Sequence, residues 1–125
     1  MDHRNPAGEP LRPESGRWRG YYEQGRGRYA QAQTMEFADG LVRGNGIDGI
    51  GAFRIEGLYR CEDGELRVGW IKTYDRGHSV LYLGQRRGDW IEGGWSLRRE
   101  PRGRMDGGFG FAPERLVSPE AQDDE

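Results

Sequence analysis

Hydrophobic and polar residues alternate along the middle of the chain in short runs, and Gly and Asp turn signals separate the runs. Alternation with a period of two predicts β-strands with one buried face. The clearest run places Leu66, Val68, Trp70, Lys72 and Tyr74 on one face. About eight such runs follow one another at near-regular spacing. We therefore predict an all-β, single-domain protein: an antiparallel up-and-down meander that forms a small closed or nearly closed barrel.

The two ends of the chain lack this pattern. Residues 1–15 carry several prolines without apolar periodicity, which predicts a flexible N-terminal arm. Residues 113–125 have the same character and finish in acidic residues, which predicts a flexible acidic tail. The barrel itself is expected over residues 16–112. Its tightest turns are expected at Asp39-Gly40 and Asp63-Gly64, the dipeptides that favour two-residue hairpins.

Glycine is abundant: the whole chain contains 22 glycine residues. Glycine inside a strand weakens it unless the backbone bends sharply or lies close to another group. Several glycines fall on or beside the predicted aromatic rows: Gly20, Gly57, Gly84, Gly93 and Gly107. They favour a tightly coiled small sheet. The alternative is that they make space for a ligand.

The segment Gly16-Arg17-Trp18 on the first strand, followed by a meander, resembles the calycin superfamily of lipocalins, fatty-acid-binding proteins and streptavidin-like barrels. The resemblance implies that Trp18 closes the barrel floor and stacks on a basic side chain, Arg102 or Arg104. Gly93-Gly94-Trp95 and the tight hairpins look closer to the streptavidin-like branch. The lipocalin Thr-Asp-Tyr element is absent, and no biotin-contacting residues can be carried over. A separate bacterial family with the same barrel is the alternative.

Composition narrows the functional classes. The net charge of -2 favours neither nucleic acid nor acidic membranes as partners. The lone Cys61 excludes an internal disulfide, which suits a reducing cytosol. No apolar run reaches the length of a membrane span, and no signal core is evident. We expect a soluble, cytoplasmic protein that does not interact with membranes.

Lys72 is the most informative residue, because the alternation points it inward beside Trp70 and Tyr74. A buried ammonium is costly unless it is paired. We therefore expect that Lys72 lies at a barrel mouth, pairs with an acid such as Asp48 or Glu36, or holds a ligand anion. The alternative is a lysine at a strand end whose stem packs on Trp70 while its charge reaches water.

Gln31 and Gln33 raise the same question, because they share a face with Met35 and Phe37. Two inward amides need hydrogen-bond partners, which a polar ligand or a water cluster would supply. A bulge or a slipped register that turns them outward is the alternative. The candidate ligand-binding residues at this end of the barrel are Lys72, Tyr74, Tyr82, Gln31, Gln33 and Asp48.

Other chemistries receive less support. The stretch from Gly44 to Gly51 resembles one copy of a calcium-binding repeat, but a glycine-rich turn with Asp48 bonded to local amides explains it better. One cysteine and one domain histidine, His78, do not make a zinc site. We expect no metal and no cofactor. An enzyme with a Lys72, Asp48, Tyr74 and His78 site is an alternative function.

The remaining candidates concern the outer surface. Arginine clusters in loops and at strand ends offer a nucleic-acid or protein interaction rim, although interleaved acids dilute its field. A homodimer through an apolar sheet face is a further candidate, because several apolar residues point outward: Leu58, Ile71, Trp90 and either Leu81 or Leu83. The leading hypothesis is a non-enzymatic barrel that binds a small molecule or a partner.

Overall fold

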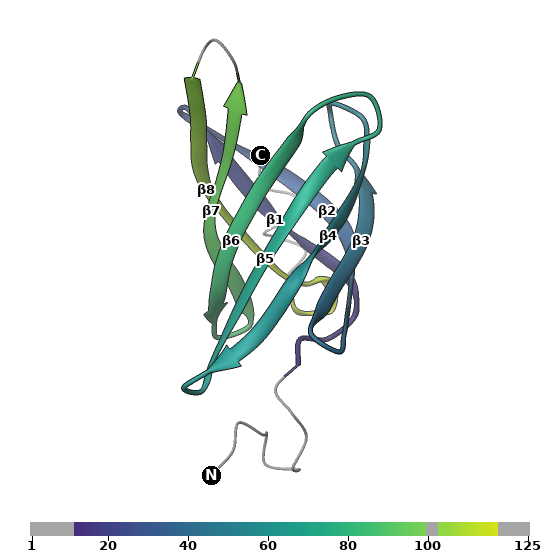
Figure 1. The fold of residues 1–125 in the computed structure, drawn as a ribbon, viewed down its shortest axis with the longest axis vertical. Helices are drawn as coiled ribbons and strands as arrows, with labels where there is room; N and C mark the ends of the chain where they lie inside the picture. Colours follow the sequence, from purple (N-terminus) through teal and green to yellow (C-terminus); the bar gives the residue numbers. More distant parts are fainter. Residues whose placement is uncertain (1–11, 100–102, 118–125) are drawn as a thin grey trace.

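The computed structural model describes residues 12–99 and 103–117, and over this part the chain forms a closed barrel of eight antiparallel strands (Figure 1). Every strand pairs with its neighbour in sequence, and β1 pairs with β8 to close the barrel. The strands are β1 (Gly16–Gln24), β2 (Gly27–Ala38), β3 (Leu41–Ile47), β4 (Ala52–Glu62), β5 (Glu65–Tyr74), β6 (Ser79–Arg87), β7 (Trp90–Arg99) and β8 (Gly103–Pro113). The predicted all-β meander is confirmed.

Two hairpin turns follow directly from their dipeptides. Asp39 and Gly40 have φ angles of 53° and 82°, and Asp63 and Gly64 have 52° and 80°. A type I′ turn requires positive φ at both central residues, and Asp-Gly tolerates this better than most pairs. These turns lie at the lower end of the barrel in Figure 1, and the β3–β4 and β5–β6 connections lie at the upper end.

Inward residues from all strands meet in a single core. Trp70 is at its centre: its ring stacks on Tyr82 at 5.2 Å between centroids and meets Phe109 edge-on at 5.4 Å. Each of these aromatic side chains removes about 150–250 Å² from water, which compensates for the small number of apolar residues. The outward positions of the same strands are polar over most of the barrel, so the alternation fixes the register.

The lower end is sealed around Trp18, which is 2% exposed. Its indole N–H donates to the Glu14 carbonyl at 2.9 Å, and the Phe37 backbone N–H donates to the Ser15 hydroxyl at 2.9 Å. Pro13 is buried beside them. Residues 13–15 therefore pack against the floor, whereas residues 1–11 of the predicted arm lie outside the described residues. The predicted stacking partner Arg102 and the side chain of Arg104 also lie outside them.

The chain leaves the barrel through a short 3-10 helix at Glu114–Leu116. The Glu114 carboxylate accepts hydrogen bonds from Arg17 at 3.2 Å and from Arg19 at 2.7 Å, and Arg115 pairs with Glu14 at 2.8 Å. These pairs connect the first strand, and Glu14 just before it, to the segment that follows the last strand. The remainder of the predicted acidic tail, residues 118–125, lies outside the described part. No helix within the described ranges is long and apolar enough to span a membrane.

Two inward-facing glycines allow strands to approach unusually closely. A Cβ atom at Gly57 would lie 2.0 Å from the Gly69 carbonyl oxygen, and one at Gly93 would lie 2.0 Å from the Leu83 carbonyl oxygen. Both neighbours are backbone atoms, so a side chain would have to displace a strand. At these two positions the glycines allow the sheet to coil tightly.

We predict that Gly57→Ala lowers the free energy of unfolding by about 1–3 kcal/mol, because the methyl group must displace β5. The midpoint of urea denaturation measures this. Gly77→Ala is the matched control, since no atom lies within 4 Å of a Cβ there. Equal midpoints for the two variants would contradict the close-approach explanation.

Candidate functional site

Lys72 points into the barrel, as its position in the alternation predicts. It lies on β5 between Ile55 on β4 and Val80 on β6, and it is only 2% exposed. Because the β3–β4 and β5–β6 connections are close by, this region forms the upper mouth of the barrel. Since Lys72 is almost fully buried, the alternative of a lysine at a strand end whose charge reaches water is wrong.

The Lys72 ammonium is held by two oxygen acceptors and a wall of aromatic rings. Its Nζ donates to Asp48 Oδ2 at 2.8 Å and to Gln31 Oε1 at 3.0 Å. It also lies over the ring of Phe53 at 4.4 Å and that of Tyr74 at 4.9 Å. Rings at these distances attract a cation through their quadrupole. The charge is thus buried together with compensating partners.

Asp48 comes from the loop between β3 and β4, and its side chain is 5% exposed. One carboxylate oxygen accepts from Lys72 and from the Tyr74 hydroxyl, the latter at 2.6 Å. The other accepts from the backbone N–H groups of Ile50 at 2.9 Å and Gly51 at 3.3 Å. The predicted turn with local amide bonds is confirmed. The other proposed acid, Glu36, is exposed on the outer wall.

The two inward glutamines continue the polar cluster along β2. Gln31 Nε2 donates to Gln33 Oε1 at 2.6 Å, and Gln33 Nε2 donates to the Met35 sulfur at 3.3 Å. Gln31 and Gln33 are 5% and 1% exposed, and they sit opposite Gly20 and Trp18 in an unbroken register. The bulge alternative is therefore wrong, and the amides satisfy one another and Lys72.

The remaining candidate residues are nearby but differently engaged. The Tyr82 ring stacks on Trp70, and its centroid is 5.8 Å from the Lys72 ammonium. His78 packs against Tyr74 at 4.9 Å between ring centroids. Among the described residues, no hydrogen bond joins the His78 imidazole to Asp48. The structure thus brings Lys72, Asp48 and Tyr74 together, and His78 reaches this group only through its contact with the Tyr74 ring.

Sequence reasoning missed two aromatic walls of the site, Phe53 and Tyr22. The Tyr22 ring centroid is 5.6 Å from the Lys72 ammonium. Both residues belong to inward rows that end at the same mouth, and this shared end was the available signal. Within the described ranges, Trp70 Nε1 is the buried side-chain polar atom that has no hydrogen-bond partner.

Burial and hydrogen bonds shift the titration of these groups. Burial lowers the pKa of Lys72, and its hydrogen bond to Asp48 opposes this shift. Burial alone would raise the pKa of Asp48, but hydrogen bonds from Lys72, Tyr74 and the Ile50 amide together bring that pKa below its usual value. Burial raises the pKa of Tyr74, and the hydrogen bond to the Asp48 carboxylate raises it further, so that this pKa lies far above its usual value.

No group of three or more potential metal ligands of the His, Cys, Asp and Glu types occurs among the described residues. Both oxygens of Asp48 already accept hydrogen bonds from protein donors. Two rim arginines are paired with acids on the outer wall: Arg28 with Glu23 at 2.9 Å, and Arg87 with Glu92 at 3.7 Å. The side chains of Arg98 and Arg99 lie outside the described part.

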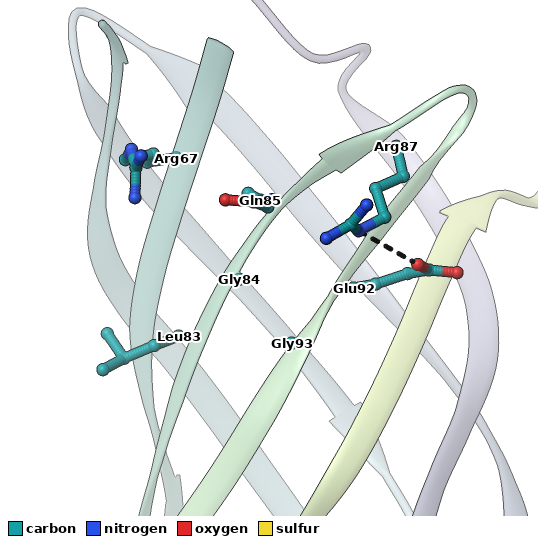
Figure 2. Close-up of a pocket in the computed structure, with 7 residues that line it drawn as sticks. All are labelled: Arg67, Leu83, Gly84, Gln85, Arg87, Glu92 and Gly93. Carbon is teal, nitrogen blue, oxygen red and sulfur yellow. Dashed lines mark ion pairs between the residues drawn. The ribbon is translucent and has the colours of Figure 1, made fainter.

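The outer wall also carries shallow grooves. One of them crosses β6 and β7 and includes Leu83, the Arg87–Glu92 pair and Gly93 (Figure 2). A neighbouring groove of about 470 Å³ lies over Gly69 between Leu58 and Leu83. Trp90 is half-buried against Tyr21, with 6.2 Å between the ring centroids.

Comparison with protein-family models, with curated proteins and with solved structures found no match to this chain.

We predict strong coupling between Lys72 and Asp48. Asp48→Ala leaves a buried ammonium without its counter-charge and lowers the free energy of unfolding by about 3–5 kcal/mol. Adding Lys72→Met in the same chain recovers much of that loss, because no charge is then stranded. Urea denaturation of the wild type, both single variants and the double variant measures the coupling. Additive effects of the two substitutions would contradict it.

We also predict that Tyr74 and Tyr82 ionise later than an exposed tyrosine. Burial raises the pKa of both in the folded state, above the unfolded value of about 10. Their contribution to stability is therefore complete below pH of about 10 and is lost as the pH rises further. Tyrosinate absorbance during an alkaline titration measures this. Tyr74→Phe should remove one late-ionising group, and an unchanged titration would contradict the assignment.

Proposed function

We propose that the protein is a non-enzymatic binding barrel that takes a small ligand bearing a carboxylate at its upper mouth. One observation carries this proposal: Lys72 and Tyr74, both fixed on β5, bind a carboxylate supplied by the β3–β4 loop rather than by the barrel wall. The Asp48 carboxylate then occupies the position that the ligand carboxylate takes when the loop moves aside.

The donors at the mouth suit a carboxylate. An ammonium and a phenol at hydrogen-bond distance form charge-assisted bonds, which are stronger than neutral ones. Gln31 accepts from Lys72 and thereby orients the ammonium toward Asp48. The surrounding rings of Phe53, Tyr22 and Tyr82 offer apolar contacts for the rest of a small molecule.

In this proposal the turn that carries Asp48 swings away from the mouth as a unit, since Asp48 and Gly51 exchange two backbone hydrogen bonds of 3.1 Å within it. Gly49 and Gly51 flank its tip, and a Cβ atom at either would have no neighbour within 4 Å. Ile50 at the tip is 64% exposed. The inward contacts of the loop are therefore concentrated in the Asp48 carboxylate. A free ligand has to compete with this tethered carboxylate, which acts at an effective concentration in the millimolar range.

The architecture is in keeping with this role. Eight strands enclose an interior just wide enough to be filled by side chains or to hold one small ligand, as in lipocalins and streptavidin. We extend the calycin-like resemblance of Gly16-Arg17-Trp18 to this chain on those grounds, with a sealed floor at Trp18 and binding at the opposite end. The unpartnered indole N–H of Trp70 is a further donor inside the barrel. The lone thiol of Cys61 suits a cytoplasmic location.

Chemical rescue tests the proposal. Sodium acetate should raise the melting temperature of Asp48→Ala more than sodium chloride at equal ionic strength, because acetate replaces the missing carboxylate. The Asp48→Ala/Lys72→Met double variant should show no such difference. In the wild type, butyrate at millimolar concentration should shift the amide NMR signals of residues 48–51 and of Lys72. Equal effects of acetate and chloride on Asp48→Ala would overturn the proposal.

A further inference from the structure

Lys72 is the only lysine of the chain, which has 19 lysine and arginine residues in total. The two residue types differ in reactivity, because a lysine amine loses its proton readily when it is buried and then becomes a nucleophile, whereas a guanidinium stays protonated. The chain thus carries its single side-chain amine at the mouth of the barrel, where it is almost fully buried.

The surroundings of the Lys72 nitrogen favour the release of its proton. Burial takes the ammonium out of water and lowers its pKa, although the hydrogen bond to Asp48 opposes this shift. A proton acceptor is already in place, since Asp48 Oδ2 lies 2.8 Å from Nζ. Lysine amines that react with carbonyl groups in proteins are activated by such desolvation. Proton transfer converts the buried ion pair into a neutral amine beside a carboxylic acid.

We infer that Lys72 binds a small, uncharged aldehyde covalently, as an imine. The ammonium first gives one proton to Asp48. The neutral nitrogen attacks the aldehyde carbon, a carbon–nitrogen bond forms, and a second nitrogen proton moves to the aldehyde oxygen, which gives a carbinolamine. The Asp48 carboxyl then protonates the hydroxyl group, the carbon–oxygen bond breaks and water leaves. The products are an iminium, the Asp48 carboxylate and one water molecule, so the reaction needs no oxidant or reductant.

The charge of the product selects an aldehyde over other amine-reactive compounds. An iminium is a cation at the position of the ammonium, so the Asp48 carboxylate and the rings of Phe53 and Tyr74 stabilise it as they stabilise Lys72. Acylation would remove the charge, and carbon dioxide would replace it by a carbamate anion. Both products would deprive the buried Asp48 carboxylate of its counter-charge, which is costly.

The walls of the mouth limit the rest of the aldehyde. The ring of Phe53 lies 4.4 Å from the Lys72 nitrogen, that of Tyr22 5.6 Å and that of Tyr82 5.8 Å, which provides apolar surface for a hydrocarbon group. An eight-stranded barrel has room for little more than its own side chains. A short aldehyde, with one carbon substituent on its carbonyl, therefore fits better than a ketone with two.

Covalent binding of an aldehyde differs from the carboxylate binding proposed above. A ligand carboxylate replaces Asp48, whereas an aldehyde bonded to Lys72 retains Asp48 as the counter-charge of the iminium. Because Lys72 is buried, the aldehyde enters when the β3–β4 turn moves aside, and the inference rests on the proposed function for this step alone.

Reductive trapping of the full chain with butanal and sodium cyanoborohydride tests the inference, because the reductant converts an iminium into a stable secondary amine. The sample carries Arg54→Lys, which adds an ordinary lysine on the exposed outer face of β4. Peptide mapping by mass spectrometry measures butylation at both positions near neutral pH. Lys72 should react at least about tenfold faster than the introduced lysine, which is almost entirely protonated under these conditions.

Two carboxyl variants show whether Asp48 takes part. Asp48→Asn keeps the size of the side chain but removes the proton acceptor, and it should slow butylation of Lys72 at least about tenfold. Glu36→Gln changes an exposed acid on the outer wall and should leave the rate unchanged. Circular dichroism checks that each variant is folded; if Asp48→Asn is not, the comparison of the two lysines decides alone.

Butylation of Lys72 no faster than that of the introduced lysine would overturn the inference, because Lys72 would then be an unreactive buried ion pair. A folded Asp48→Asn variant that reacts as fast as the wild type would also overturn it. The acetate rescue of Asp48→Ala involves no covalent step. Its outcome therefore separates a failure of the proposed carboxylate site from a failure of aldehyde binding.

Discussion

The pairing of β1 with β8 is the constraint on which the rest of the structure depends. It closes the sheet, so no strand edge is left among the described strands and every strand has one inner and one outer face. The interior of an eight-stranded barrel has room for little more than the inward side chains. Each inward position therefore carries an apolar side chain, carries no side chain, as at Gly57, or carries a polar side chain whose partners lie inside the barrel. Lys72 is the extreme case, because it places a charge where closure excludes water.

The way in which the Lys72 charge is paired explains why the stability of the whole barrel depends on one loop. Desolvation of the ammonium is costly, and the nearest wall residue, Gln31, offers only a neutral acceptor. The counter-charge comes from Asp48, outside the strands, so the β3–β4 loop is drawn against the mouth. A contact that stabilises the fold is thereby placed in a loop rather than in the strands. This dependence of the barrel on one loop carboxylate is the basis of the binding site proposed at the mouth.

Local chemistry and periodicity were sufficient to predict the strands, the Asp-Gly turns and the inward position of Lys72. They could not choose between Asp48 and Glu36 as its partner, because that choice depends on which turn meets β5 after closure. They also could not rule out a bulge at Gln31, since two amides satisfy each other only once their burial is known. The rows across the outer face were inaccessible for the same reason: register between strands is a property of the closed sheet.

Glycine has different roles on the inner and outer faces of the closed barrel. Inward glycines such as Gly57 and Gly93 allow backbones to approach closely, whereas outward Gly69 makes room for the side chain of Leu83 on the neighbouring strand. The two surfaces meet on β5, where Ile71 faces out and Lys72 faces in. A slip of one residue in this strand would exchange them, exposing the charge and burying Ile71. The mouth and the outer face therefore depend on the same register of β5. The residues that form one of these surfaces limit which residues can form the other.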